Sequence, residues 1–274
     1  MAGRAAWGDR ILRVVDHVQA HLDDELQPED LAQRAGLSLH HFHRVFRGLT
    51  GESVMGFVRR LRLERAAQRL RFGDRPVTEV AFGSGYGSHE AFTRAFRSRF
   101  GQSPSDYRST ARVALGSTPA VEFREQPAKR CLARRHVGPY QDCGQAWDAL
   151  MDKGGVLAAQ LRQGEGFGLC YDDPEVTPAS RLRYDACLAL PESLGEVPCP
   201  DGCVFRTVPG GRYAVTTHAG SFDTIFETYV GFIGRSLPFA GVELTNDPIV
   251  EIYLAEPTTT PPDDLLTEIC VRLA

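Results

Sequence analysis

Two internal duplications, one in each half of the chain, limit the possible fold more than any other sequence feature. In the first half, GLSLHHFHRVFRGLTGES from Gly36 and GYGSHEAFTRAFRSRFGQS from Gly85 align at an offset of 50 after one extra residue in the second copy. Aromatic, charged and glycine positions all match, among them Phe42 with Phe92, Arg44 with Arg94 and Gly51 with Gly101. The match predicts two copies of one supersecondary unit.

Each copy is typical of two helices joined by a tight turn. In the first copy, Pro28 stands just inside a helix start, Gly36 ends that helix and Ser38 can cap the next one. In the second copy, residues 77–83 form the short helix and Ser88 caps the long one. The long helices are expected to bury one apolar stripe each: Phe42, Val45, Phe46 and Leu49, and Phe92, Ala95, Phe96 and Phe100.

A further helix is predicted between the copies. Residues 53–72 contain no proline and repeat apolar residues at helical spacing. The buried stripe is expected to be Val54, Phe57, Val58, Leu61, Ala66 and Leu70. The arginines of this helix are interpreted as a solvated face, of which one or two reach a phosphate: Arg59, Arg60, Arg62, Arg65 and Arg69. After Gly101, Ser103, Pro104 and Asp106 indicate one more helix start.

The two halves carry opposite charge. Residues 1–118 hold 18 arginines, no lysine and 13 acidic residues, a net charge of +5. Residues 119–274 hold 13 basic and 22 acidic residues, a net charge of −9. A basic half can accumulate on a polyanion, whereas an acidic half cannot. All seven cysteines lie in the acidic half as well, so the halves are predicted to be separate domains with different roles.

The basic half has the features needed to read DNA. The major groove admits one α-helix, and two helices about one helical turn (~34 Å) apart on one chain can enter successive grooves without a dimer. Arginine can bind guanine O6 and N7 together. The sides of the long helices opposite the apolar stripes carry the candidate contacts: His40, His43, Arg44 and Arg47 in the first copy, and His89, Glu90, Thr93, Arg94 and Arg97 in the second. Double-stranded DNA is therefore the predicted partner.

Residues from about 10 to about 110 resemble the two-subdomain DNA-binding region of the AraC/XylS transcription regulators. The resemblance rests on AGLSxxHFxRxFRxxTGES in the first copy and GYGSxxxFTRAFRxRFGQSPSDYR in the second. It implies an all-α double helix-turn-helix domain. It also implies that His40, His43 and Arg44 contact bases in one groove, and that the next groove is faced by His89, Glu90, Thr93 and Arg94.

Three of these residues have alternative interpretations. His40 and His43 have the spacing of neighbours on one helix face, but no cysteine or carboxylate accompanies them at a firm metal-ligand spacing, so no metal is predicted. Glu90 could repel phosphate or accept a hydrogen bond from cytosine N4, and both readings stay open.

The acidic half contains the second duplication. After a small-residue linker, ALGSTPA at 114–120, the pattern predicts two strands, a helix at 139–161 and two more strands, ending at 190. This order recurs at an offset of 82 to 83, which aligns Phe123 with Phe205, His136 with His218, Trp147 with Tyr229 and Asp185 with Glu268. An α+β domain of two pseudo-symmetric ββαββ repeats is predicted. A cleft between such copies is a common place for a small molecule.

This pattern resembles the GyrI-like ligand-binding domain of multidrug-sensing regulators, with the landmarks HVGPY, RYDAC, PGGRYAVTTHAGSF, VEIYLAEP and LLTEICVRL. The resemblance implies that Glu251, in the strand IVEIYL, faces a ligand pocket. A carboxylate among large apolar neighbours is costly if buried alone, and a cationic ligand would offset that cost with help from aromatic rings. The expected walls are Tyr253, Tyr140, Trp147, Tyr171, Phe222 and Tyr229. The alternative is that Glu251 lies on a solvent face and the aromatic residues are core.

Other polar residues of the acidic half are read as structural. Asp185 and Glu268 occupy equivalent strands and are taken as exposed or structural. His136 and His218 precede glycine turns symmetrically, which suggests a role at a strand end in each copy. Cys199 and Cys203 have a metal-like spacing but no second pair nearby, so no metal is predicted there.

The sequence as a whole predicts a DNA-binding domain over 1–113, a linker over 114–120 and a small-molecule-binding domain over 121–274. The chain has no apolar run of 18 residues and no signal-peptide pattern at its start, so a cytoplasmic location and no membrane partner are expected. An odd number of cysteines argues against a full disulfide framework.

The predicted function is that of a one-component transcription regulator, not an enzyme. A small cationic or amphipathic effector would bind the second domain, with RNA polymerase as a further partner and without a cofactor. Two alternatives stay open. Glu251 and Tyr253 could serve as the base of a hydrolase that acts on a reactive small molecule, although no nucleophile motif accompanies them. The second domain could instead dock a protein on a constitutive DNA-binding protein.

Overall fold

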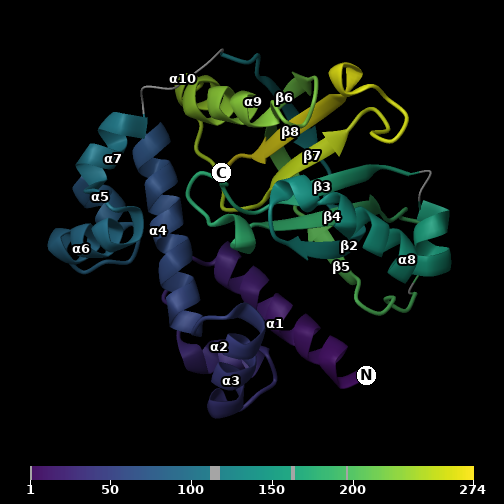
Figure 1. The fold of residues 1–274 in the computed structure, drawn as a ribbon, viewed down its shortest axis with the longest axis horizontal. Coiled ribbons are helices and arrows are strands. Elements are labelled where there is room, and N and C mark those ends of the chain that lie inside the picture. Colours follow the sequence, from purple (N-terminus) through teal and green to yellow (C-terminus); the bar gives the residue numbers. More distant parts are fainter. Residues whose placement is uncertain (1, 112–117, 162–163, 196) are drawn as a thin grey trace. The chain divides into compact units, whose positions relative to one another are not determined.

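The computed structural model describes residues 2–111, 118–161, 164–195 and 197–274. The chain forms two compact units, residues 1–114 and residues 115–274, which are taken separately below (Figure 1). Within the described part of the chain, no helix is both long enough and apolar enough to cross a membrane.

The first unit is all helical. The first helix-turn-helix copy consists of α2 (Pro28–Arg34) and α3 (Leu39–Thr50), and the second of α5 (Val77–Phe82) and α6 (His89–Phe100). The remaining helices are α1 (Ala2–Ala20), α4 (Val54–Phe72) and α7 (Pro104–Ala111). The predicted double helix-turn-helix arrangement is confirmed, with α4 running from one copy to the other (Figure 1).

Glycines with positive φ make the two sharp turns possible. Gly36 has a φ of 64° between α2 and α3, and Gly85 has a φ of 77° between α5 and α6. Residues other than glycine rarely adopt these backbone angles. Ser88 caps α6 as predicted, because its hydroxyl accepts from the Ala91 N–H at 3.2 Å. Ser38 occupies the same position before α3, but its hydroxyl makes no cap bond. Ser38 is exposed, so water can satisfy the helix end there.

The duplicated aromatic residues form the cores of the two copies. Phe42 and Phe46 are fully buried, as are their counterparts Phe92 and Phe96. The stripe predicted for α4 is also buried throughout. Leu49 differs from the prediction: 46% of it is exposed, because it lies in the last turn of α3, where the stripe has run past the core.

The arginines of α4 differ more sharply from the prediction. Arg59 is exposed, but four others bind protein groups, so the solvated-face interpretation was wrong for them. Their partners are carboxylates and backbone carbonyls: Glu52 and Glu64 for Arg60, Leu22 and Asp24 for Arg62, Asp23 and Gln19 for Arg65, and Gly83 and Asp23 for Arg69. The physical reason is that helices of both copies pack against α4, so little of its surface reaches water.

The second unit contains the two predicted ββαββ copies. The first copy comprises β1 (Glu122–Gln126), β2 (Lys129–Val137), α8 (Gly144–Leu161), β3 (Gly166–Cys170) and β4 (Arg183–Ala189). The second comprises β5 (Val204–Val208), β6 (Gly211–Ala219), α9 (Ile225–Gly231), β7 (Ile249–Tyr253) and β8 (Leu266–Arg272), with a π-helical turn and the short α10 (Leu237–Phe239) after α9. The predicted fold class is confirmed.

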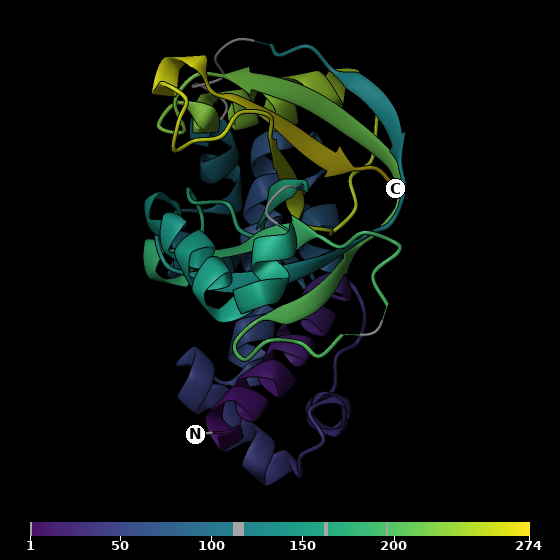
Figure 2. The ribbon, with the colours of Figure 1, turned by 90° about the vertical axis from the view of Figure 1, so that its right-hand side faces the viewer.

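The eight strands of the described residues form one curled antiparallel sheet, in the order β1-β6-β8-β7-β3-β4-β2-β5 (Figures 1 and 2). The order is symmetric about its centre, where β3 of the first copy pairs with β7 of the second. The first strand of each copy pairs with the other copy, since β1 lies beside β6 and β5 beside β2. The copies therefore exchange their edge strands and cannot separate without breaking the sheet.

Helices α8 and α9 cover the same face of the sheet. Leu150 of α8 packs with Leu132 and Leu188 of the first copy. The turn that follows α9 buries Phe232 against Ile269 and Val271 of the second. Side chains alternate along a strand, so every second residue faces the opposite side of the sheet. On that side Phe167 and Leu169 of β3 and Val250 of β7 belong to a separate cluster. The central strands β3 and β7 thus lie between the two helices on the covered face.

Candidate nucleic-acid interface and small-molecule site

Helix α3 presents a cationic face. His40, His43, Arg44 and Arg47 are all exposed, on the side of the helix opposite Phe42 and Phe46. No carboxylate pairs with either arginine among the described residues. The described residues also contain no group of three or more side chains that could hold a metal ion. The arrangement leaves two guanidinium groups available for phosphates or base edges.

Helix α6 presents the equivalent face with several differences. Arg94 and Arg97 are exposed, and His89 is half-buried. The hydroxyl oxygen of Thr93 is buried without a hydrogen-bond partner among the described residues, so it does not point outward in this conformation. The Glu90 carboxylate lies at the start of α6, where it accepts hydrogen bonds from its own backbone and from Ser88. These hydrogen bonds lower the pKa of the Glu90 carboxyl.

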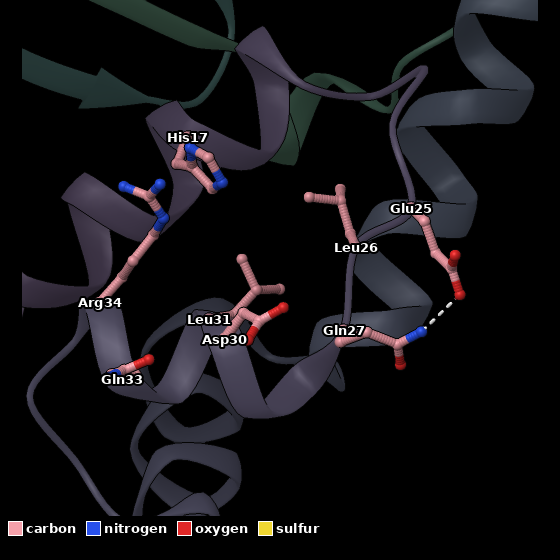
Figure 3. A pocket seen from close by; sticks show the side chains of 8 residues that line it. All are labelled: His17, Glu25, Leu26, Gln27, Asp30, Leu31, Gln33 and Arg34. Atoms are coloured by element: carbon pink, nitrogen blue, oxygen red, sulfur yellow. Dashed lines mark hydrogen bonds between the residues drawn. The ribbon is translucent and has the colours of Figure 1, made fainter.

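A pocket of about 390 Å³ lies on the first unit, and none of the side chains that line it comes from α3 or α6 (Figure 3). Its walls come from α1, α2 and the connection between them: His17, Glu25, Leu26, Gln27, Asp30, Leu31, Gln33 and Arg34. Burial lowers the pKa of His17, and His21 and Arg34 lower it further. These residues form no sequence motif, so sequence reasoning did not single them out.

Glu251 lies at the centre of the second unit, on the helix-covered face of β7. Its exposed fraction is 8%. Tyr229 from α9 donates its hydroxyl to Oε1 of Glu251 at 2.6 Å, and Tyr253 from β7 donates to Oε2 at 2.8 Å. Both carboxylate oxygens are therefore bound by phenol hydroxyls, which offsets part of the cost of burying the charge.

The hydrogen bonds continue from Tyr253 across the sheet to α8. The hydroxyls of Tyr253 and Tyr184 lie 2.7 Å apart, and the indole N–H of Trp147 donates to the Tyr184 hydroxyl at 2.9 Å. Tyr184 is on β4 and Tyr253 on β7, so their contact passes over the strand between them, β3. Gly168 of β3 leaves the room for it, because a Cβ at this position would lie 2.6 Å from the Tyr253 hydroxyl.

Burial and charge keep the donors of this network protonated. Burial raises the pKa of Tyr229 and Tyr253 well above the usual value, and the nearby Glu251 carboxylate raises both further. Burial and Glu251 also raise the pKa of Cys143 to about 11, and they raise the pKa of Cys170 well above its usual value. At neutral pH these groups are hydroxyls and thiols, so Glu251 is surrounded by neutral neighbours.

Four predicted aromatic walls gather at Glu251. Besides Tyr229 and Tyr253, the ring of Trp147 lies 5.9 Å from that of Tyr253, and the ring of Phe222 lies 5.8 Å from it on an edge-to-face approach. Phe222 is 39% exposed, so the cluster reaches the surface there. The symmetry is informative: Trp147 and Tyr229 align at the repeat offset of 82 and enter the site from α8 and α9.

The other two predicted walls lie elsewhere. Tyr140 donates its hydroxyl to the Asp172 carbonyl at 2.7 Å and reaches the network only through its ring, 6.5 Å from that of Tyr184. Tyr171 is on the opposite face of the sheet, where it donates to Asp185 at 2.8 Å and stacks under Arg135. Strand alternation explains the correction, since Tyr171 shares its face with Phe167 and Leu169.

Sequence reasoning missed Tyr184, Cys170 and Gly168. One signal was available, because the offset of 83 aligns Gly168 with Glu251, and these two residues are direct partners in the pairing of β3 with β7. The site is thus the point where the two copies meet, with a glycine from one copy opposite a glutamate from the other.

Asp185 and Glu268, on equivalent strands of the two copies, both lie in ion pairs with arginines. Asp185 is fully buried and bound by Arg135 and Arg206, so the exposed interpretation was wrong and the structural one holds. Burial alone would raise the pKa of Asp185, but the two arginines outweigh it and hold the pKa below its usual value. Glu268, its counterpart, accepts from Arg124 at 2.7 Å.

The paired histidines and the spaced cysteines also have local roles. His136 and His218 each bind a carbonyl three residues on, Pro139 at 3.1 Å and Ser221 at 3.0 Å, as expected for strand-end positions. The thiol of Cys199 donates to the carbonyl of Cys203 at 3.3 Å.

Two family models of known proteins match this chain, one in each half. The family model of the GyrI-like small molecule binding domain matches residues 119–274, more than half of the chain, and the chain belongs to this family. A helix-turn-helix domain model matches residues 31–110, and this region is of the AraC type.

Among characterised proteins, the chain is similar to transcriptional regulator Rob of Salmonella typhimurium strain LT2. The two are 34% identical over 109 residues, which cover 39% of this chain and 38% of Rob. Regulatory protein SoxS of the same organism is 35% identical over 98 residues, or 36% of this chain and 92% of SoxS. A solved structure of the AdpA DNA-binding domain in complex with a target DNA is 35% identical, covers 37% of this chain and 92% of its own, and has a TM-score of 0.36.

Proposed function

We propose that this protein is a DNA-binding transcription regulator that reads two successive major grooves with α3 and α6 and responds to a small cationic molecule bound at Glu251. One observation carries the DNA-binding part: the two duplicated helices each expose arginines and histidines on the side opposite their buried phenylalanines. The AraC-type family assignment and the likeness to Rob and SoxS support it.

On each face, some residues are proposed to contact base edges and others to contact phosphates. His40, His43 and Arg44 lie in the first half of α3, the part of a recognition helix that contacts base edges. Arg47 lies in the last turn, as Arg97 does in α6, where phosphates are the nearer target. Arg94 is the counterpart of Arg44 in the second groove. Glu90, held at the start of α6, is expected to contribute less than His89 or Arg94.

Selection of bound fragments from random duplexes would identify an operator and test this proposal. On that operator, Arg44→Ala should cost about 1–3 kcal/mol of binding free energy and relax base choice at one position. Arg47→Ala should weaken operator and random DNA alike and reduce the salt dependence of binding. An unchanged footprint and affinity for Arg44→Ala would remove Arg44 from base reading, and no selective binding by the wild type would overturn the proposal.

The effector part rests on Glu251. A buried carboxylate bound by two hydroxyls still lacks a counter-charge among the groups described around it, and a cation would supply one. The rings of Trp147, Tyr253 and Phe222 offer faces and edges to an organic cation at the same place. When a cation binds, the tyrosine hydroxyls must share or release Glu251, so an occupied site has a different hydrogen-bond pattern from an empty one.

Control of transcription requires that the effector bind the active and inactive states with different affinity. RNA polymerase is the proposed further partner. Titration with aromatic cations separates this proposal from its alternatives. Binding without turnover supports a sensor, consumption of the added compound would indicate a hydrolase that uses Glu251, and no binding would favour a protein-docking role.

A further inference from the structure

The two recognition helices are connected by a chain of ion pairs that passes through α4. Glu52 follows the end of α3 and pairs with Arg60 of α4 at 3.0 Å. Arg60 also pairs with Glu64, one turn further along α4, at 3.0 Å. Glu64 in turn binds Arg99, in the last turn of α6, at 3.1 Å. One continuous set of charges therefore joins the C-terminal ends of α3 and α6.

These ion pairs are shielded from water. The exposed side-chain fractions are 6% for Glu64, 10% for Arg60, 16% for Glu52 and 28% for Arg99. Surface pairs with long side chains contribute little, but a shielded pair fixes geometry, because moving either partner leaves a charge without compensation. Glu64 has the strongest constraint, since its two oxygens bind arginines from two different helices.

A second set of contacts joins other parts of the same two copies. Asp23, in the connection between α1 and α2, accepts from Arg65 at 3.0 Å and from Arg69 at 3.5 Å. Arg69 also donates to the carbonyl of Gly83, just after α5, at 3.1 Å. Arg62 donates to the Leu22 carbonyl at 2.8 Å and packs against Gly85, where an added Cβ would meet its guanidinium at 2.6 Å.

We propose that this arginine-carboxylate framework of α4, centred on Glu64 and Asp23, holds α3 and α6 at one separation and one rotational phase. The inference rests on the proposed DNA-binding function. Two grooves are bound together only if the helices match the helical repeat of DNA, and a rigid link makes the second contact follow the first at high effective concentration. Glu64, Arg60 and Asp23 are thus positioning residues that restrict the spacing of the two half-sites.

The test uses the full chain with Glu64→Gln and three DNAs: the selected operator, the same operator with one or two base pairs inserted between the half-sites, and a single half-site. The wild type should bind the operator far more tightly than the spaced version. In Glu64→Gln, that preference should fall about tenfold, while half-site affinity stays within about twofold. Glu79→Gln, which changes an exposed carboxylate on α5, is the matched control and should behave as the wild type.

A second variant guards against misfolding. Arg99→Gln removes the link from Glu64 to α6 and leaves the pair of Arg60 with Glu64, so it should fold and show the same relaxed spacing. Circular dichroism and thermal unfolding establish that each variant is folded. If both folded variants keep the wild-type spacing preference, the proposal is overturned. It is also overturned if both lose half-site affinity as strongly as operator affinity. A wild type that binds no operator would instead contradict the proposed DNA-binding function.

Discussion

At the scale of single residues, the most informative side chain is Glu251. A carboxylate with an exposed fraction of 8% is uncommon unless it is paired with a cation or hydrogen-bonded. Here the hydroxyls of Tyr229 and Tyr253 bind both oxygens, and their raised pKa values mean that they remain donors. Neutral donors stabilise the carboxylate without cancelling its charge, and this is the basis on which a cationic effector is proposed.

Glu251→Gln should therefore separate charge from shape. The amide keeps nearly the same volume and can still accept from a tyrosine, but it carries no charge. An aromatic cation such as benzyltrimethylammonium should lose about 1.5–3 kcal/mol of binding free energy, and a neutral analogue of equal size should lose much less. Calorimetry with both compounds measures the difference.

Glu268→Gln is the control for that experiment, because Glu268 is a glutamate on the neighbouring strand that pairs with Arg124. It should leave the binding of both compounds unchanged. Equal losses for the cation and the neutral compound in Glu251→Gln would leave Glu251 with a purely structural role.

At the scale of elements, β3 determines whether the network can form. It lies between β7 and β4, so the hydroxyls of Tyr253 and Tyr184 meet above it. Gly168 has no side chain to occupy that space, and an added Cβ would lie 2.6 Å from the Tyr253 hydroxyl and 2.7 Å from the Tyr184 hydroxyl. The glycine of β3 thus makes room for the hydrogen bonds that run from Glu251 through Tyr253 and Tyr184 to Trp147 on α8.

Gly168→Ala should push the two tyrosines apart. Overpacking of this kind typically costs about 1–3 kcal/mol of unfolding free energy. The Trp147 indole, which donates to Tyr184, should change its fluorescence and its N–H chemical shift. Gly195→Ala, at a glycine with open space around it, should change neither the stability nor the spectrum by a comparable amount. An unaltered Trp147 signal in Gly168→Ala would show that the tyrosines do not depend on the glycine.

At the scale of the whole molecule, two duplications were used in different ways. In the first unit, the copies remain separate bodies joined by α4 and its ion pairs. In the second, the copies exchange edge strands and share one sheet, so the site arises at their junction. The division of charge along the chain makes the first unit basic and the second acidic, so only the first is expected to accumulate on a polyanion such as DNA.

The pH dependence of the molecule should reflect its buried tyrosines. Burial raises the pKa of Tyr213 to about 12, and it also raises the pKa of five others: Tyr86, Tyr140, Tyr184, Tyr229 and Tyr253. An unfolded tyrosine ionises near pH 10, so these groups do not change stability below that pH. Above it the unfolded state loses protons first, and the free energy of unfolding should fall.

Two measurements check this expectation. Denaturant unfolding should give a stability that already falls between about pH 8 and about pH 9, because the cysteines of the unfolded chain ionise there while burial raises the pKa of Cys143, Cys170 and Cys270 in the folded protein. The stability should fall further above about pH 10, where the tyrosines of the unfolded chain ionise. Tyrosinate absorbance of the folded protein should show only a minority of the eight tyrosines ionising near the normal pKa. Ionisation of all of them near pH 10 without unfolding would contradict the burial described here.

Local periodicity was enough to predict most elements and the buried faces of their helices. The duplicated phenylalanines, the apolar stripe of α4 and the ββαββ order depend on spacing along the chain, and spacing along a helix or strand largely decides which side chains are buried. Spacing did not single out Glu251 or its aromatic neighbours; the family resemblance made them candidates, and their role in ligand binding stays a prediction.

Partners across space could not be predicted from that spacing. Tyr184 and Gly168 belong to the site because β3 lies between β4 and β7, and the sequence does not state which strands are neighbours. The arginines of α4 look solvated on a helical wheel, yet Arg60 and Arg65 find carboxylates about 8 and 42 residues away. The order of residues along a helix or strand determines which of its faces is buried. The partners of its polar groups depend on packing between distant segments, because a charge binds whichever partner the fold brings within reach.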